Sequence, residues 1–290
     1  MKHFITLADL PDFNKTLASA IELKKDATRF DSIGKGKTLG MLFFNPSLRT
    51  RLSTQKAAQN LGVHTMVMNF SNEAWALEFE DGTKMSGLRS EHVKEAAAVV
   101  SQYCDMVAIR AFASLTDKEK DEAEIVLKSF AKYASVPIIN MESATAHPLQ
   151  GLADAITIEE LKTKKRPKVV MSWAPHPKAL PQAVPNSFVT MMHEMDVHFC
   201  ITHPKGYDLN PKITKDSTII YNQEEALIAC KEDVTRERNF SLCDIGQRIG
   251  DEILIDEYCI EIVGTTTGTP MDNFPDDQRA TFCGIGDPKS

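Results

Sequence analysis

The sequence predicts an α/β protein with two doubly wound domains, each built on a parallel sheet flanked by helices. Three observations lead to this fold class. Apolar runs of strand length alternate with helical patterns over the first 161 residues, a second series follows a polar linker, and 290 residues suffice for two domains of ordinary size. Such alternation is typical of parallel sheets that carry helices on both faces.

The predicted elements follow one another in a regular order. Strands are expected at 37–44, 63–70, 105–112 and 136–141, and helices at 13–25, 50–61, 91–103, 119–133 and 149–161. Residues 162–167 form a polar linker, and strands at 168–174 and 197–203 begin the second series. We therefore expect a domain boundary near the 149–161 helix, with domains at 1–150 and 151–290.

The segment Phe43-Phe44-Asn45-Pro46-Ser47-Leu48-Arg49-Thr50-Arg51 joins an apolar strand to a helix. Ser47 falls at the expected N-cap, where unpaired backbone N–H groups and the positive end of the helix dipole attract anions. Arg49 and Arg51 add planar cations that match phosphate oxygens two at a time, and the hydroxyl of Thr50 adds a hydrogen bond. This pattern indicates a phosphate site, although a capped helix with two surface arginines would produce it too.

A second motif, Met141-Glu142-Ser143-Ala144-Thr145-Ala146-His147-Pro148-Leu149-Gln150, follows the apolar run at 136–140. Pro148 suits the first turn of the next helix, where its missing N–H has no cost. His147 and Gln150 would then lie at the carboxyl ends of the strands, where open α/β sheets bind ligands. A histidine that only caps the helix is the alternative.

These two motifs together resemble the aspartate and ornithine carbamoyltransferase family, in which an S-x-R-T-R loop and an H-P-x-Q turn bind carbamoyl phosphate. Three more segments resemble the branch that carbamoylates N-acylated ornithine: Asn72-Glu73-Ala74-Trp75, Ala108-Ile109-Arg110-Ala111-Phe112 and Trp173-Ala174-Pro175-His176-Pro177. The resemblance extends from the N-terminus to about Ala226. It implies a carbamoyl-phosphate domain at 1–150, an acylornithine domain at 151–290 and an active site in the cleft between them.

The resemblance implies an enzyme of arginine biosynthesis that transfers the carbamoyl group of carbamoyl phosphate to the δ-amine of an N-acylated L-ornithine. N-acyl-L-citrulline and phosphate would be the products. The residues it assigns to carbamoyl phosphate are Ser47, Leu48, Arg49, Thr50, Arg51, Trp75, Arg110, His147 and Gln150, of which Thr50, Arg110 and His147 would polarise the carbonyl oxygen. No metal or organic cofactor is expected, because amine attack on an acyl phosphate requires neither.

For the acylornithine, the resemblance implies contacts from Glu142, His176, Ser90 and Arg236. Ser90 lies in a loop where succinyl-using members carry proline and acetyl-using members carry glutamate, so it matches neither pattern. N-succinyl-L-ornithine is favoured over N-acetyl-L-ornithine, because Arg89 beside Ser90 could receive a second carboxylate and neighbouring segments resemble those of succinyl users. His176 could instead be an ordinary loop histidine between two prolines.

The resemblance also implies a homotrimer in which Trp75 reaches into a neighbouring subunit's site and covers the bound phosphate. A core tryptophan is the alternative reading of Trp75. The start of the chain shows no signal-peptide pattern and no stretch approaches ~20 uninterrupted apolar residues, so a cytoplasmic protein without membrane contact is expected. The six cysteines lack CxxC spacing, which predicts neither a zinc site nor a disulfide framework.

Residues 228–290 differ from the rest of the chain. Residues 1–227 contain 27 basic and 27 acidic residues, so the whole net charge of −7 arises in this tail, which also holds four of the six cysteines. The family's lysine-asparagine-tryptophan segment, H-C-L-P loop and final helix have no counterpart here, and only Arg236 stands near the expected lysine. The segments 264–270 and 272–277 are expected to be loop or disorder, too polar to complete a buried sheet. A frameshift, an artefact and genuine divergence all predict such a tail.

Three rival functions follow from these observations. A protein that binds carbamoyl phosphate without turning it over is the main one, because motifs of the second domain are missing. Nucleic-acid binding is disfavoured by the balanced charge of residues 1–227. A dinucleotide enzyme is disfavoured because no G-x-G-x-x-G follows the first predicted strand.

Overall fold

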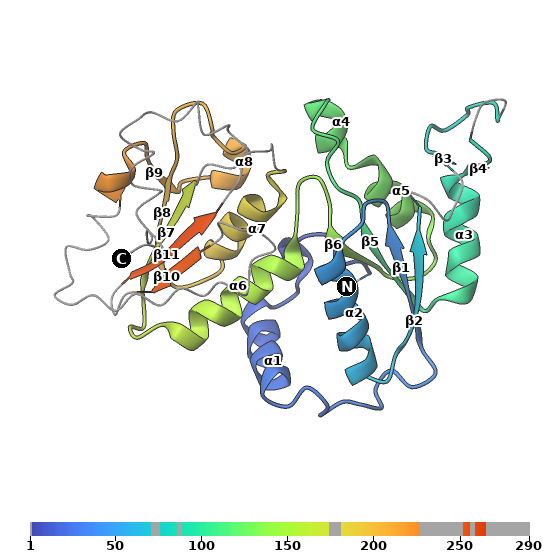
Figure 1. Ribbon diagram of the computed structural model, residues 1–290, viewed down its shortest axis with the longest axis horizontal. Coiled ribbons are helices and arrows are strands. Elements are labelled where there is room, and N and C mark those ends of the chain that lie inside the picture. Colours follow the sequence, from blue (N-terminus) through green and yellow to red (C-terminus); the bar gives the residue numbers. More distant parts are fainter. Residues whose placement is uncertain are drawn as a thin grey trace, which may run out of the picture. The chain divides into compact units, whose positions relative to one another are not determined.

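The structure, a computed structural model, describes residues 2–70, 76–85, 89–173, 181–226, 252–255 and 259–264. The chain divides into two compact units, Met1–Leu152 and Ala153–Ser290. Each unit contains one main sheet, built mostly of parallel strands, with helices beside it (Figure 1). None of the helices within the described ranges combines the length and apolar character needed to cross a membrane.

The first unit contains four parallel strands in the order β2-β1-β5-β6. Their bounds are β1 (Thr38–Phe43), β2 (His64–Asn69), β5 (Met106–Arg110) and β6 (Ile138–Glu142). The helical elements are η1 (Leu7–Asp9), α1 (Phe13–Lys25), α2 (Leu48–Asn60), α3 (Val93–Tyr103), α4 (Lys118–Ala123) and α5 (Ile125–Tyr133), and α6 (Pro148–Leu161) begins in this unit and ends in the second. The predicted α/β class with parallel strands is therefore confirmed for this sheet.

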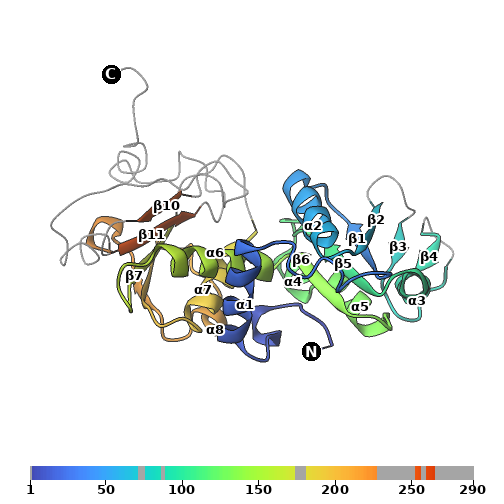
Figure 2. The ribbon, with the colours of Figure 1, turned by 90° about the horizontal axis from the view of Figure 1, so that it is seen from below.

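The strand order reverses between β1 and β5, because the chain moves outward to β2 and then returns across β1 to β5. Opposite directions of travel place the connecting helices on opposite faces. One core packs Met41 and Phe43 of β1 against Ala58 of α2, and the other packs Ile109 of β5 with Phe130 of α5. Figure 2 shows α2 on one side of this sheet and α3 with α5 on the other. Open α/β sheets bind ligands at the carboxyl ends of strands at such a reversal.

Two of the predicted helices differ from the structure. The helix expected at 119–133 is two helices, α4 and α5, because Glu124 between them has a left-handed backbone (φ 53°, ψ 41°). The helix expected at 91–103 begins only at Val93, since Glu91–His92 forms the short strand β4, which pairs with β3 (Leu77–Glu78). Tertiary contacts override the local helical pattern at both places.

The second unit contains a five-stranded sheet in the order β10-β11-β7-β8-β9. Its elements are β7 (Lys168–Trp173), α7 (Ala183–Met192), β8 (His198–Thr202), α8 (Pro211–Thr214), β9 (Thr218–Ile220), β10 (Glu252–Ile255) and β11 (Cys259–Gly264). All neighbours pair in parallel except β10 and β11, which are antiparallel. Mixed sheets with one antiparallel edge strand are common in α/β proteins.

The tail thus contributes two strands that the sequence analysis did not predict. The apolar, β-branched residues Ile253, Ile255, Ile260 and Ile262 favour strands at these positions. Of the segments expected to be loop or disorder, only Gly264 is described, and it ends β11. The rest of 264–270 and all of 272–277 lie outside the described residues.

Candidate active site

Ser47 caps α2 directly beyond the carboxyl end of β1. Its backbone is extended (φ −155°, ψ 117°), and its Oγ accepts a hydrogen bond from the backbone N–H of Thr50 at 3.3 Å. The same Oγ donates to Thr50 Oγ1 at 2.9 Å. The predicted N-cap is therefore confirmed. The N–H groups of the first turn of α2 lie at the edge of the sheet where an anion is favoured.

The first turn of α2 carries two arginines and no acidic residue. Arg49 and Arg51 are exposed, whereas Thr50 between them is buried. The backbone of Leu48 begins the helix while its side chain is 74% exposed. Cations at a helix N-terminus are opposed by the helix dipole, usually by about 0.3–1 kcal/mol. Two arginines at this position, beside the backbone N–H groups of the first turn, suit the binding of an anion.

Arg110 ends β5 and is almost fully buried. Its Nη2 donates to Glu142 Oε2 at 2.8 Å, and its Nη1 donates to the carbonyl oxygens of Pro46 at 3.0 Å and Asn45 at 3.4 Å. The guanidinium therefore ties β5 to the end of β6 and to the loop that precedes Ser47. Its Nε is a buried donor for which the described residues supply no hydrogen-bond acceptor.

A register shift in the sheet brings the Arg110 and Glu142 pair together. Ile109 pairs with Asn140, yet the next residue, Arg110, pairs with Glu142, so that β6 contributes one additional residue at this point. Bulges of this kind re-aim side chains and are frequent next to active sites. Glu142 is fully buried, and its carboxylate consequently meets Arg110 at the carboxyl edge of the sheet.

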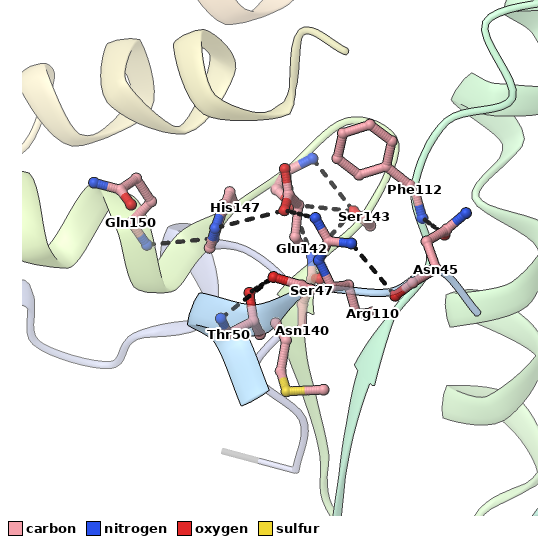
Figure 3. A network of polar contacts seen from close by, with 12 residues as sticks. Asn45, Ser47, Thr50, Arg110, Phe112, Asn140, Glu142, Ser143, His147 and Gln150 are labelled. Carbon is pink, nitrogen blue, oxygen red and sulfur yellow. Dashed lines mark hydrogen bonds and ion pairs between the residues drawn. The ribbon is translucent and has the colours of Figure 1, made fainter. Parts of the chain in front are cut away.

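His147 lies at the same edge and precedes α6, whose first turn contains Pro148 as predicted. Its Nδ1 accepts a hydrogen bond from the backbone N–H of Gln150 at 3.4 Å, and its Nε2 lies 3.9 Å from Glu142 Oε2. Figure 3 shows Arg110, Glu142 and His147 in one connected network, with Ser47 and Thr50 close by. The structure thus brings together the phosphate motif and the histidine motif.

The turn between Glu142 and His147 is held by side chains that the sequence analysis did not single out. The Asn140 amide donates to Ser143 Oγ at 3.0 Å and to the carbonyl oxygen of Ala146 at 3.2 Å. Glu124 accepts three hydrogen bonds from Ser143 and Thr145. A polar Asn140 inside an apolar run was a usable signal, but no sequence pattern marks Glu124.

Of the predicted acylornithine residues other than Glu142, only Ser90 is among the described residues. Ser90 is exposed in the segment before β4, and the neighbouring Arg89 donates from Nη1 to Glu78 Oε1 at 3.0 Å. Trp75, His176 and Arg236 lie outside the described residues. Among the residues that are described, no three His, Cys, Asp or Glu side chains gather in a way that would hold a metal ion.

Comparison with known protein families identifies the family to which these two motifs belong. Residues 2–160 match the model of the aspartate/ornithine carbamoyltransferase carbamoyl-P binding domain, which spans both motifs and all four strands of the first sheet. The chain belongs to the aspartate/ornithine carbamoyltransferase family.

Its relatives within that family include carbamoyltransferases of acylated ornithines. The chain is 50% identical over 226 residues to an N-succinylornithine carbamoyltransferase of Bacteroides thetaiotaomicron, a match that covers 78% of this chain and 71% of the relative. It is 39% identical over 209 residues to an N-acetylornithine carbamoyltransferase of Xanthomonas axonopodis pv. citri, covering 70% of this chain and 60% of the relative.

A solved transcarbamylase has the same architecture. It is an N-acetyl-L-ornithine transcarbamylase with one glutamate replaced by serine, complexed with carbamyl phosphate and N-succinyl-L-norvaline. The TM-score is 0.70 at 36% identity, and the match covers 78% of this chain and 72% of that structure. The α/β architecture with parallel sheets and flanking helices is therefore that of the transcarbamylases.

Proposed function

We propose that this chain transfers the carbamoyl group of carbamoyl phosphate to the δ-amine of an N-acylated L-ornithine, with N-succinyl-L-ornithine as the preferred acceptor. The products are N-acyl-L-citrulline and phosphate, as a step of arginine biosynthesis. The observation that carries this proposal is the convergence of the capped α2 terminus, Arg110 and His147 at one sheet edge in a chain of this family.

The phosphate of the substrate is bound at the start of α2. Ser47, Thr50 and the N–H groups of Leu48 and its neighbours donate hydrogen bonds, and Arg49 and Arg51 supply charge that matches phosphate oxygens. As the neutral δ-amine attacks the carbonyl carbon, a tetrahedral intermediate forms; its C–O bond to phosphate then breaks, and a proton from the attacking nitrogen passes to the leaving phosphate. The leaving phosphate dianion gains stabilisation from the same donors, which makes their effect larger in the transition state than in the ground state.

The carbonyl oxygen is polarised by Thr50, Arg110 and His147. Arg110 suits this role because its guanidinium is already held by Glu142 and two backbone carbonyl oxygens while Nε has no acceptor among the described residues. Donors fixed in advance need no rearrangement as negative charge develops on the oxygen. Gln150 accepts a hydrogen bond from the carbamoyl NH₂ group and fixes its orientation.

The preference for a succinyl group rests on the relatives and on Ser90. The relative at 50% identity is an N-succinylornithine enzyme. We take Ser90 to correspond to the glutamate whose replacement by serine, in the solved transcarbamylase, accompanies bound N-succinyl-L-norvaline. A serine avoids the repulsion between a glutamate and the second carboxylate of a succinyl group.

The remaining assignments follow the family resemblance. The unit that ends at Leu152 binds carbamoyl phosphate, and the following unit binds the acylornithine. Glu142, His176 and Arg236 contact the acylornithine. The chain forms a homotrimer in which Trp75 covers the phosphate in the neighbouring subunit's site, and sedimentation analysis of the purified protein tests this assembly.

Turnover is tested by measuring phosphate release and carbamoylated product from carbamoyl phosphate with N-succinyl-L-ornithine, N-acetyl-L-ornithine or L-ornithine. We expect the succinyl substrate to be turned over fastest. His147→Ala should lower kcat by roughly 10²–10³-fold, because one donor to the carbonyl oxygen is lost. If no substrate is carbamoylated while carbamoyl phosphate still raises the melting temperature, the chain is instead a carbamoyl-phosphate binder without turnover.

Ser90→Glu tests the choice of acyl group. The added carboxylate should lower the ratio of kcat/KM for the succinyl over the acetyl substrate by about tenfold, equivalent to about 1.4 kcal/mol. Ser32→Glu, which adds the same charge at another exposed serine, is the matched control and should leave the ratio unchanged. An unaltered ratio in Ser90→Glu would remove Ser90 from the specificity site.

A further inference from the structure

Glu124 has a backbone conformation that is unfavourable for a glutamate. It is left-handed (φ 53°, ψ 41°) at the junction where α4 ends and α5 begins. Glycine adopts this conformation without a steric penalty, whereas a residue with a Cβ does not. Glu124 is also the N-cap residue of α5, yet its side chain makes no capping hydrogen bond. Neither backbone preference nor helix capping explains a glutamate at this position.

The carboxylate of Glu124 binds the turn that precedes His147. Its Oε1 accepts hydrogen bonds from Ser143 Oγ at 2.7 Å, from the backbone N–H of Thr145 at 2.7 Å and from Thr145 Oγ1 at 2.6 Å. Three donors therefore converge on a single oxygen atom. Hydrogen bonds to an ionised carboxylate are shorter and about twice as strong as those between neutral groups.

The turn passes this restraint on to His147. The backbone N–H of Ser143 donates to the carbonyl oxygen of Ala146 at 2.9 Å, which closes the turn, and the next residue is His147. The buried His147 ring is then held by the backbone N–H of Gln150 and lies 3.9 Å from Glu142. A shift of the turn would move the imidazole, because the backbone of His147 begins where the turn ends.

We infer that Glu124 is a positioning residue that fixes the 143–146 turn and thereby holds the His147 ring in place at the carboxyl edge of the first sheet. Its effect on turnover rests on the proposed carbamoyl transfer, in which His147 polarises the carbonyl oxygen. A displacement of a catalytic group by about 1 Å can lower a rate by about 10²-fold. The unfavourable backbone at Glu124 is the cost of directing its carboxylate at the turn.

The variant Glu124→Gly removes the carboxylate and keeps a residue that tolerates the left-handed backbone. We expect it to lower kcat by roughly 10–100-fold. Glu124→Gln should stay within about threefold of wild type, because an amide oxygen in place of Oε1 can accept the same three hydrogen bonds. Glu122→Ala, which removes an exposed glutamate of α4, is the matched control and should not change kcat.

A double-mutant cycle separates positioning of His147 from a general structural role. If Glu124 acts through His147, Glu124→Gly should change the residual turnover of His147→Ala by less than about twofold, whereas independent effects would add. An equal loss in both backgrounds, or wild-type turnover in Glu124→Gly, would overturn the inference. If Glu124→Gly fails to fold, the double variant Ser143→Ala with Thr145→Val takes its place. This variant removes the two hydroxyl groups that donate to Glu124, and the same outcomes would support or overturn the inference.

A second readout does not depend on turnover. The imidazole ¹H–¹³C resonance of His147, identified by its absence from His147→Ala, should move in Glu124→Gly and remain in place in Glu122→Ala. A wild-type chain that carbamoylates none of the three ornithines would refute the proposed function alone, and the His147 resonance would still decide the role of Glu124. An unmoved resonance in Glu124→Gly would refute it.

Discussion

The buried polar groups at the carboxyl ends of the two sheets differ in kind: an ion pair lies at the first sheet, whereas a hydrogen bond between neutral side chains lies at the second. At the first sheet, Arg110 donates to Glu142 and to the carbonyl oxygen of Pro46, and the Asn140 amide donates to Ser143 Oγ, while Arg110 Nε and Asn140 Oδ1 have no hydrogen-bond partner within the described residues. At the second sheet, Gln223 Nε2 donates to Ser172 Oγ at 2.7 Å. Trp173 Nε1, Thr202 Oγ1 and Gln223 Oε1 are buried there without partners in the described part of the chain.

Burying a charged pair requires more free energy than burying neutral polar groups. A buried ion pair such as Arg110 with Glu142 has a desolvation penalty that its own attraction only partly offsets. At the carboxyl end of the first sheet, which we call the first edge, backbone carbonyl oxygens accept further hydrogen bonds from Arg110, and the bulge aligns Arg110 with Glu142. Both features offset more of that penalty. Both edges retain buried polar atoms without a hydrogen-bond partner in the described part of the chain, and each such atom lowers stability by about 1–3 kcal/mol unless it gains a partner.

The largest expected effect comes from breaking the ion pair at the first edge. Arg110→Met should lower the free energy of unfolding by about 3–5 kcal/mol, because it leaves the Glu142 carboxylate buried without its guanidinium. It should also lower kcat by roughly 10²-fold or more, through loss of a donor to the carbonyl oxygen. Urea denaturation and the turnover assay measure the two effects on the same protein.

The double variant Arg110→Met with Glu142→Met separates stability from function. Removing both charges should restore most of the lost stability while turnover stays low, since the desolvation penalty disappears together with the catalytic group. Asp105→Asn, which breaks the exposed Lys37–Asp105 ion pair, is the control and should shift the denaturation midpoint only slightly. A double variant as unstable as Arg110→Met would mean that the network is needed for folding itself.

At the first edge, the features that depend only on residues adjacent in the sequence were predicted correctly. Ser47 as the N-cap of α2 and Pro148 at the start of α6 follow from capping and proline geometry. The strands followed from apolar runs. These features need only a few adjacent residues, so their patterns are visible in the chain.

The features that escaped prediction depend on contacts between distant residues. The pairing of Arg110 with Glu142 requires a bulge in the β5 and β6 ladder, and strand register is not encoded by apolar runs alone. Glutamate is a good helix former, so Glu124 was placed inside a helix at 119–133, whereas its bonds to the 143–146 turn accompany a left-handed backbone. In the second unit, β11 pairs with β7, which lies far back in the sequence.

The smallest expected effect tests the unpaired hydroxyl at the second edge. Thr202→Val replaces Oγ1 by a methyl group of similar volume, and it should raise the free energy of unfolding by about 1 kcal/mol because a buried polar atom without a partner is removed. Thr157→Val is the matched control: this buried threonine donates from Oγ1 to the carbonyl oxygen of Ala153 at 3.0 Å, so the same substitution should lower stability. Urea denaturation of both variants decides the comparison. A loss of stability in Thr202→Val equal to that in Thr157→Val would show that the Thr202 hydroxyl has a hydrogen-bond partner in solution.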